Sequence, residues 1–202
     1  ITVIVVFPLI WMLVLSLKSN AEILSDPLSL PKTLNLDNYV HALDTLNYVQ
    51  LYANTFFVCI ASIIIELAIT YFSSFVLARM YFKSRKVRNL LYGFLIMGLS
   101  VSPFILLFPV YRINVMLNLR DQLALIFPYV ATSISFNTLL LTGYLKALPA
   151  EIDEAAVIDG CSLWDLMFRI ILPMAKPVIA TVVIFNVLYI WNEYPFASVM
   201  LR

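Results

Sequence analysis

The sequence predicts an all-α membrane protein, a polytopic bundle of helices, on three observations. Its mean hydropathy is +0.94, and only 12% of its residues are charged, against roughly 25% in soluble domains. Long apolar runs alternate with short polar stretches, and about 20 apolar residues suffice to cross the hydrocarbon core as a helix. Basic residues crowd into one polar stretch, as they do on the cytoplasmic side of membrane proteins.

The apolar runs predict five membrane segments. They cover residues 1–17, 51–78, 90–110, 123–145 and 177–200. The first begins in apolar residues without the charged flank of a signal peptide, and the chain stops at Arg202. We therefore expect a single membrane domain over residues 1–202 that is truncated at both ends. Pro103 and Pro109 lie in the third segment, where they would either break the helix or only kink it.

The loop after the second segment sets the orientation. Its basic residues, with no acid among them, are Arg79, Lys83, Arg85, Lys86 and Arg88. The positive-inside rule places this loop in the cytoplasm. By parity, residues 18–50 and 111–122 lie outside and residues 149–173 lie inside. The first outer loop carries only Lys18 and Lys32 as basic residues, in agreement with this topology.

Residues 149–173 concentrate acidic side chains. Five of the twelve acids lie within fifteen positions: Glu151, Asp153, Glu154, Asp159 and Asp165. We expect a first short helix with Pro149 in its opening turn and a left-handed turn at Gly160. Ser162 and Asp165 have the spacing of a capping box that opens a second helix, and Pro173 closes that helix or marks the entry into the fifth membrane segment.

The acidic character of residues 149–173 decides among partners. Helices that rest on the cytoplasmic leaflet are usually basic, because that leaflet is negative. A DNA-binding pair of helices would also need basic residues for phosphate contacts, so we expect no nucleic acid. The small side chains of Ala155 and Ala156 would let another protein approach closely. The interpretation is a cytoplasmic docking element, with an amphipathic interfacial pair as the alternative.

The residues of this loop also carry a family resemblance. The matching residues are Glu154-Ala155-Ala156, Gly160 four positions later, and Ile170-Ile171-Leu172-Pro173. They resemble the EAA loop of type I ABC importer permeases. Similarity to the carbohydrate branch extends over nearly the whole chain, through Phe7-Pro8-Leu9-Ile10-Trp11, Ser16-Leu17-Lys18, Asn54-Thr55, Leu77-Ala78-Arg79, Gly143-Tyr144-Leu145-Lys146-Ala147-Leu148-Pro149, Lys176-Pro177 and Trp191-Asn192-Glu193-Tyr194-Pro195-Phe196-Ala197.

The resemblance implies a type I importer permease fold with cytoplasmic coupling helices, in a bacterial or archaeal plasma (inner) membrane. It implies an ATP-driven importer of a sugar or related carbohydrate. The implied partners are cytoplasmic ATPase subunits, a second permease subunit, identical or related, and an extracytoplasmic solute-binding protein. The implied ATPase-coupling residues are Glu154, Ala155, Ala156, Asp159, Gly160, Leu172 and Pro173, and residues 149–173 are called the coupling loop below.

The chain itself carries no means of hydrolysing ATP. It has no G-x-x-x-x-G-K-[ST] phosphate loop, and its four glycines cannot build a glycine-rich cradle. We therefore expect no cofactor in this chain, with ATP and Mg²⁺ held by the partner ATPase, and no enzymatic activity. His41 stands without ligand-spaced neighbours, so we expect no metal site, and two cysteines in dissimilar segments predict no disulfide framework.

Polar residues at membrane depth are candidates for the substrate pathway, because they are costly to bury. Glu66 interrupts the second segment, and it is either a hydrogen-bonded carboxyl between helices or a substrate or gating residue. Asn137, Asn186, Asn192 and Glu193 are the other candidates, although amides also bond across helices merely to satisfy themselves. An ion-coupled secondary transporter is the alternative function, but no internal repeat supports it. A membrane-embedded enzyme would need an acid paired with Glu66, and no other segment centre supplies one.

Overall fold

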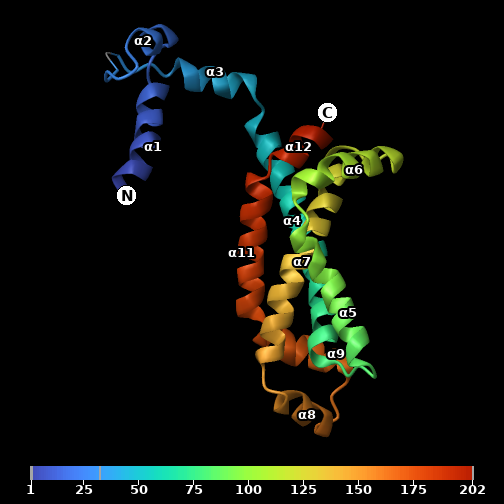
Figure 1. Cartoon of the computed structure of the whole chain (residues 1–202). Helices are drawn as coiled ribbons and strands as arrows, with labels where there is room; N and C mark the ends of the chain where they lie inside the picture. Colours follow the sequence, from blue (N-terminus) through green and yellow to red (C-terminus); the bar gives the residue numbers. More distant parts are fainter. Residues whose placement is uncertain (1, 32, 202) are drawn as a thin grey trace. The chain divides into compact units, whose positions relative to one another are not determined.

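The computed structural model describes residues 2–31 and 33–201, and these form helices and connecting turns without a strand. The predicted all-α class is confirmed. The chain divides into two compact units, Ile1–Ala53 and Asn54–Arg202, which are described separately (Figure 1). Lys32 and Arg202, which entered the predictions of topology and chain ends, lie outside the described residues.

The first unit is organised around a buried lysine. It contains α1 (Thr2–Ser16), α2 (Asn20–Ser25) and α3 (Asp37–Thr45). α1 coincides with the first predicted segment, but its 15 residues are fewer than the roughly 17–25 of a spanning helix. Lys18 is fully buried, and its Nζ donates to the Asp26 carbonyl oxygen at 3.0 Å and to Ser29 Oγ at 2.9 Å.

Two long helices form the axis of the second unit. α4 (Tyr48–Arg79) starts in the first unit and continues through the second, and α7 is Asp121–Ala147. Both are long and apolar enough to cross a membrane, which confirms the predicted segments at 51–78 and 123–145. Two bent helix pairs could each supply one further span.

The first bent pair is the third predicted segment, which is broken rather than kinked. α5 (Arg85–Ile96) continues into the 3₁₀ turn η1 (Met97–Ser100), and α6 (Pro103–Met116) leaves at 102°. Because Pro103 cannot donate a backbone hydrogen bond, it opens a new helix. Ser135 of α7 donates its hydroxyl to the Leu95 carbonyl oxygen at 2.7 Å, which supplies a donor near the break.

The fifth predicted segment also differs from a single helix. α11 (Lys176–Asn192) ends eight residues before position 200, and the short α12 (Pro195–Met200) follows. The Glu193 carboxylate explains the interruption. It accepts from the backbone N–H groups of Phe196 at 2.7 Å and Ala197 at 3.2 Å, so it caps α12 instead of extending α11. The prediction of one helix through Met200 was therefore wrong.

Two apolar cores hold the second unit together. One joins α4, α7, α11 and α12 through buried residues that include Val58, Ile126, Tyr129, Ile190 and Phe196. The other joins α4, α7 and α11 to the coupling loop through residues that include Phe75, Leu141, Leu145, Ile171 and Val182. In Figure 1, α6 and α12 lie at one end of this bundle, and α8 and α9 lie at the other.

Candidate functional site

The coupling loop begins with the short helix α8 (Glu151–Ile158). Pro149 does not lie in its opening turn as predicted, because Ala150 is the N-cap residue. Leu148, which precedes the proline, takes an extended conformation with ψ 140°, as residues before proline prefer. α8 therefore follows α7 after a non-helical linker of three residues, 148–150.

Gly160 makes the predicted left-handed turn after α8, with φ +74°. The Gly160 N–H donates to the Val157 carbonyl oxygen at 3.1 Å, and the Cys161 N–H donates to the Ala156 carbonyl oxygen at 2.9 Å. This pair of bonds is a Schellman motif, which satisfies carbonyl groups at a helix end. Cys161 also packs against the core that contains Ala156, so the turn is fixed on its apolar side.

The second half of the loop opens with the predicted capping box. Ser162 Oγ accepts from the Asp165 N–H at 3.1 Å and donates to the Asp165 carboxylate at 2.6 Å. This hydroxyl, followed by the nearby charge of Arg169, lowers the pKa of the Asp165 carboxyl below its usual value. The sequence pattern thus identified both the residue that starts the helix and the side chain that stabilises it.

The helix that follows is not a plain α-helix. α9 (Leu163–Asp165) passes into the π-helix η2 (Leu166–Ile171) and then into α10 (Leu172–Met174). Pro173 does not close the chain's helical path. The path bends by 70° between Met174 and Lys176, so Pro173 marks the approach to α11, which is the second of the two predicted roles. Nothing in the sequence pattern had indicated the π-helix.

The outer face of α8 combines acidic and apolar side chains. Glu154, Ala155, Asp159 and Gly160 are exposed, and so are Val157 (70%) and Ile158 (85%). Ala156 instead faces the chain's own core and is only 4% exposed. Its small side chain lets α8 lie close to the bundle, whereas that of Ala155 keeps the outer surface narrow. Leu172 is half-buried and Pro173 is exposed.

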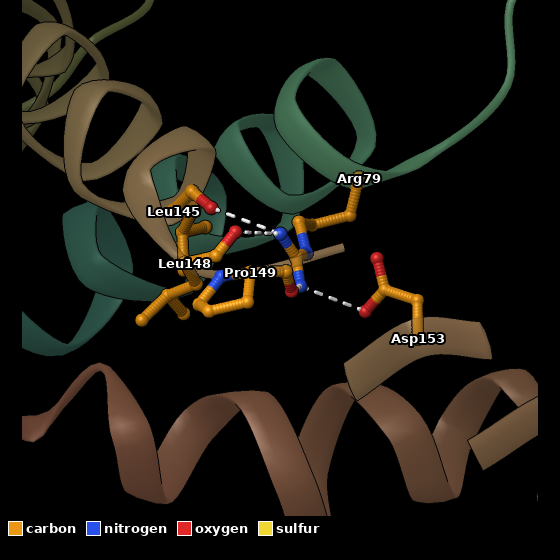
Figure 2. A network of polar contacts seen from close by, with 5 residues as sticks. All are labelled: Arg79, Leu145, Leu148, Pro149 and Asp153. Atoms are coloured by element: carbon orange, nitrogen blue, oxygen red, sulfur yellow. Dashed lines mark hydrogen bonds and ion pairs between the residues drawn. The ribbon is translucent and has the colours of Figure 1, made fainter. Parts of the chain in front are cut away.

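A buried arginine joins α8 to two membrane helices (Figure 2). Arg79 ends α4, and its side chain is 5% exposed. Its Nη1 donates to the carbonyl oxygens of Leu145 at 3.3 Å and Leu148 at 2.8 Å. Its Nη2 donates to the Pro149 carbonyl oxygen at 2.9 Å and to Asp153 Oδ1 at 3.0 Å. These five residues are called the Arg79 network below.

The Arg79 network also bears on sidedness. Arg79 begins the basic turn between α4 and α5, and Asp153 belongs to α8, so the basic turn and the coupling loop lie at the same end of the bundle. A second bond ties α4 to the other half of the loop, where the Tyr71 hydroxyl donates to the Met167 carbonyl oxygen at 2.6 Å. Both halves of the loop are thus anchored to one helix.

A buried polar stripe runs along α4 inside the membrane bundle. Ser62, Glu66, Thr70 and Ser74 recur every four residues, so they lie on one helix face, and all are fully buried. The side chains of Ser133, Asn137 and Asn186 lie within electrostatic reach of the Glu66 carboxyl. Within the described residues, however, neither Glu66 oxygen accepts a well-formed hydrogen bond.

Three of the predicted pathway residues meet in this layer. Asn186 Nδ2 of α11 donates to Asn137 Oδ1 of α7 at 3.0 Å, in buried surroundings. Together with Glu66, these amides connect α4, α7 and α11 at membrane depth. Unpaired polar groups in such a site are costly. The layer therefore favours an arrangement of α4, α7 and α11 in which these side chains are paired.

The other two candidates lie at the opposite end from the coupling loop. Glu193 borders a cavity of about 420 Å³ whose lining includes Asn54, Gln122, Tyr129 and Trp191. The Tyr129 hydroxyl donates to the Glu193 carboxylate at 2.7 Å, so this carboxylate both caps α12 and fixes a tyrosine. Asn192 is exposed and donates to the Leu188 carbonyl oxygen of its own helix at 2.7 Å.

The fold and the coupling loop together define a multi-pass membrane protein of the importer permease class. The family described as "Binding-protein-dependent transport system inner membrane component" matches residues 69–202. The chain belongs to this family.

Individual relatives agree with that membership. The chain is 34% identical over 194 residues to the diacetylchitobiose uptake system permease protein NgcG of Streptomyces coelicolor, covering 96% of this chain and 63% of NgcG. It is 30% identical over 204 residues to the probable starch degradation products transport system permease protein AmyC of Thermoanaerobacterium thermosulfurigenes. This match covers 98% of this chain and 73% of AmyC.

A solved structure shares the fold. It is the crystal structure of a bacterial ABC transporter involved in the import of the acidic polysaccharide alginate, with a TM-score of 0.81 over 100% of this chain and 70% of that chain at 22% identity. This likeness establishes the fold of a type I importer permease. Family membership does not favour the ion-coupled secondary transporter, and the relatives are transport permeases rather than enzymes.

Proposed function

We propose that this chain is a permease subunit of an ATP-driven importer for a sugar or related carbohydrate, and that α8 is the helix through which an ATPase moves it. The observation that carries the proposal is the exposed surface of α8, where Val157 and Ile158 stand beside Glu154 and Asp159. Exposed apolar residues flanked by carboxylates suit a groove with an apolar floor and basic or polar edges. The names of NgcG and AmyC support a carbohydrate substrate.

Each coupling residue has a distinct task in this proposal. Glu154 contacts a basic or polar residue of the ATPase, and Ala155 allows the two surfaces to approach closely. Asp159 and Gly160 form the tip of the turn, where the chain reverses toward the bundle. Leu172 and Pro173 lead into the bend before α11, so they carry motion of the loop into that helix.

The partners and the sidedness complete the proposal. The basic turn that begins at Arg79 shares an end with the coupling loop, and the positive-inside rule places that end in the cytoplasm, where the ATPase subunits act. A second permease, identical or related, completes the membrane pathway. A solute-binding protein delivers substrate at the opposite end, near α12.

The polar residues divide between two parts of the proposed pathway. Glu193 and Asn192 lie at the end that receives substrate, beside or near the cavity lined by Trp191. Glu66, Asn137 and Asn186 are enclosed in this conformation, so they would meet the pathway only when α4, α7 and α11 separate. We assign them a gating role, in which the polar layer opens as the helices move.

Crosslinking tests the docking surface. The full-length subunit is co-expressed with its ATPase after Cys59→Ser and Cys161→Ser, and Ile158→Cys is paired with single cysteines around the ATPase groove. A short bifunctional thiol reagent is expected to link Ile158→Cys to the ATPase, with a yield that ATP changes. Tyr194→Cys, 74% exposed near α12, is the matched control at the other end. An intact complex in which Ile158→Cys never reacts with the ATPase would overturn the proposal.

A further inference from the structure

Arg79 places a charged side chain where burial makes the charge costly. Its guanidinium group is almost entirely removed from solvent, and a buried charge is tolerated only when other groups compensate it. Asp153 supplies one carboxylate, and the backbone of residues 145–149 supplies three carbonyl oxygens. The compensation therefore comes from two elements other than α4 itself.

The three carbonyl groups belong to the place where α7 ends. The last four carbonyl groups of a helix lack intrahelical partners and carry the negative end of the helix dipole. Leu145 is among the last four residues of α7, and Leu148 is its C-cap residue. A guanidinium group suits this site better than an ammonium group, because its planar donors can serve several acceptors in fixed directions.

The same side chain spans the linker that would otherwise be a hinge. Leu148, Pro149 and Ala150 are not helical, and a short non-helical linker between helices is where a bend would occur. Arg79 bonds to Leu148 and Pro149 inside the linker and to Asp153 beyond it. The linker is thereby fixed to the last turn of α4 (Figure 2).

We propose that Arg79 is a positioning residue that makes α8, the linker and the ends of α4 and α7 move as one body. The inference rests on the proposed function, since it assigns the residue that passes motion of α8 to the membrane helices. Tyr71 cannot replace it, because its hydroxyl bonds to Met167 in the other half of the loop. Without Arg79, α8 could tilt on its linker while α4 and α7 stay in place.

The first measurement is the spread of distances between α8 and α4. Nitroxide labels are placed on cysteines at Glu151, which is exposed on α8 outside the proposed docking surface, and at Ile69, which is exposed on α4, in the full-length, assembled complex lacking Cys59 and Cys161. Electron paramagnetic resonance is expected to give a narrow distance distribution for the parent and a broad one for Arg79→Met and Arg79→Lys. Arg169→Met is the control, because Arg169 pairs at 2.9 Å with Asp165, only four positions away in the same helical stretch.

The second measurement separates positioning from mere folding. The rate at which a membrane-impermeant maleimide labels Tyr194→Cys is recorded with and without ATP and vanadate. In the parent, nucleotide trapping at the ATPase is expected to change this rate at the far end of the bundle. In Arg79→Met, the complex should assemble and trap nucleotide while the change in labelling rate is lost. Arg120→Met, at the end distant from α8, should keep the change.

The outcomes distinguish this inference from the proposed function. If the parent complex shows no nucleotide response, the proposed function fails. If the parent responds and Arg79→Met responds equally, with a narrow distance distribution, the positioning role of Arg79 is overturned. If Arg79→Met does not assemble, Asp153→Asn decides, because it leaves the carbonyl bonds and weakens only the bond to α8. A broadened distribution in Asp153→Asn supports the inference, and an unchanged one overturns it.

Discussion

At the scale of single residues, Gly160 is the position where backbone conformation alone restricts the side chain. Its φ of +74° is unfavourable for residues with a Cβ atom, although a Cβ here would meet nothing within 4 Å. The cost of a larger residue at this position is therefore backbone strain and not a collision with neighbouring atoms. We expect Gly160→Val to lower the free energy of unfolding by about 1–2 kcal/mol and to weaken assembly with the ATPase while membrane insertion survives.

Denaturant unfolding in detergent and co-purification of the ATPase measure the two effects of Gly160→Val. Gly160→Asn is the control, since asparagine adopts the left-handed conformation at lower cost. Equal stability and assembly of the valine variant and the parent would show that the Schellman turn does not determine the loop's shape.

Asp165 makes a prediction about pH. Its pKa is lowered first by the hydrogen bond from Ser162, so the ionised form is favoured in the folded loop. The contribution to stability is therefore present above the ordinary carboxyl pKa and is lost as pH falls through the lowered value. We expect Ser162→Ala to raise the pKa of Asp165 toward 3.8, its unperturbed value. The carboxyl ¹³C shift of Asp165, followed through an acid titration, measures this, and an unchanged midpoint would contradict the capping box.

At the scale of elements, the 3₁₀ turn that precedes the break between α5 and α6 lies close to α7. A Cβ atom added to Gly98 would collide with Ser135 Oγ and lie 3.4 Å from Ser135 Cβ. We expect Gly98→Ala to cost about 1–3 kcal/mol and Ser135→Ala about 1 kcal/mol, since Leu95 then loses a donor. The double variant should cost less than the sum, because the colliding hydroxyl is gone.

Thermal or denaturant unfolding of the four variants completes this double-mutant cycle. Gly93→Ala in the preceding helix α5 is the control, because an added Cβ there meets nothing within 4 Å. Strictly additive costs would mean that Gly98 and Ser135 are not in the predicted contact.

The elements also show which features the sequence could predict. Gly160 and Ser162 were predictable, because a left-handed turn and a capping box depend on neighbours a few positions away. The predicted fifth helix ran through Met200, whereas α11 ends at Asn192. An apolar run in the sequence does not reveal that the Glu193 carboxylate caps a new helix. The sequence left a break and a kink at Pro103 open, and the hydrogen bond from Ser135 to Leu95 near that break comes from another helix.

At the scale of the whole molecule, composition was sufficient for the fold class and insufficient for the connections between helices. Arg79 was recognised as one of five basic residues that orient the chain and as part of the resemblance at Leu77-Ala78-Arg79, but its bonding partners were not predicted, because topology rules count charges without pairing them. Its partners are backbone carbonyl groups and one acid 74 positions away. No local pattern identifies such a set. Glu66, in contrast, was identified from its cost in the membrane, and the structure places it among Ser133, Asn137 and Asn186.

The polar layer around Glu66 gives a prediction for transport. We expect Glu66→Gln to keep most of the uptake activity, because the amide retains the shape and can exchange hydrogen bonds with Asn137 and Asn186. Glu66→Leu should insert and assemble but transport poorly, because it leaves those amides facing an apolar side chain. Uptake by membrane vesicles that contain the full complex measures both. If the Glu66→Leu complex takes up substrate as fast as the parent complex, Glu66 has no part in gating.

The enclosed lysine of the first unit has a practical consequence for chemical footprinting. Lys18 is held by the Asp26 carbonyl oxygen and Ser29, whereas Lys83, Lys86 and Lys176 are exposed. An acylating reagent that enters the aqueous spaces on both sides should modify those three amines quickly and Lys18 slowly. Mass spectrometry of the digested protein would then show the protected amine as a sign that the segment around Lys18 is folded. Ser29→Ala should speed the reaction of Lys18 without changing that of the exposed amines.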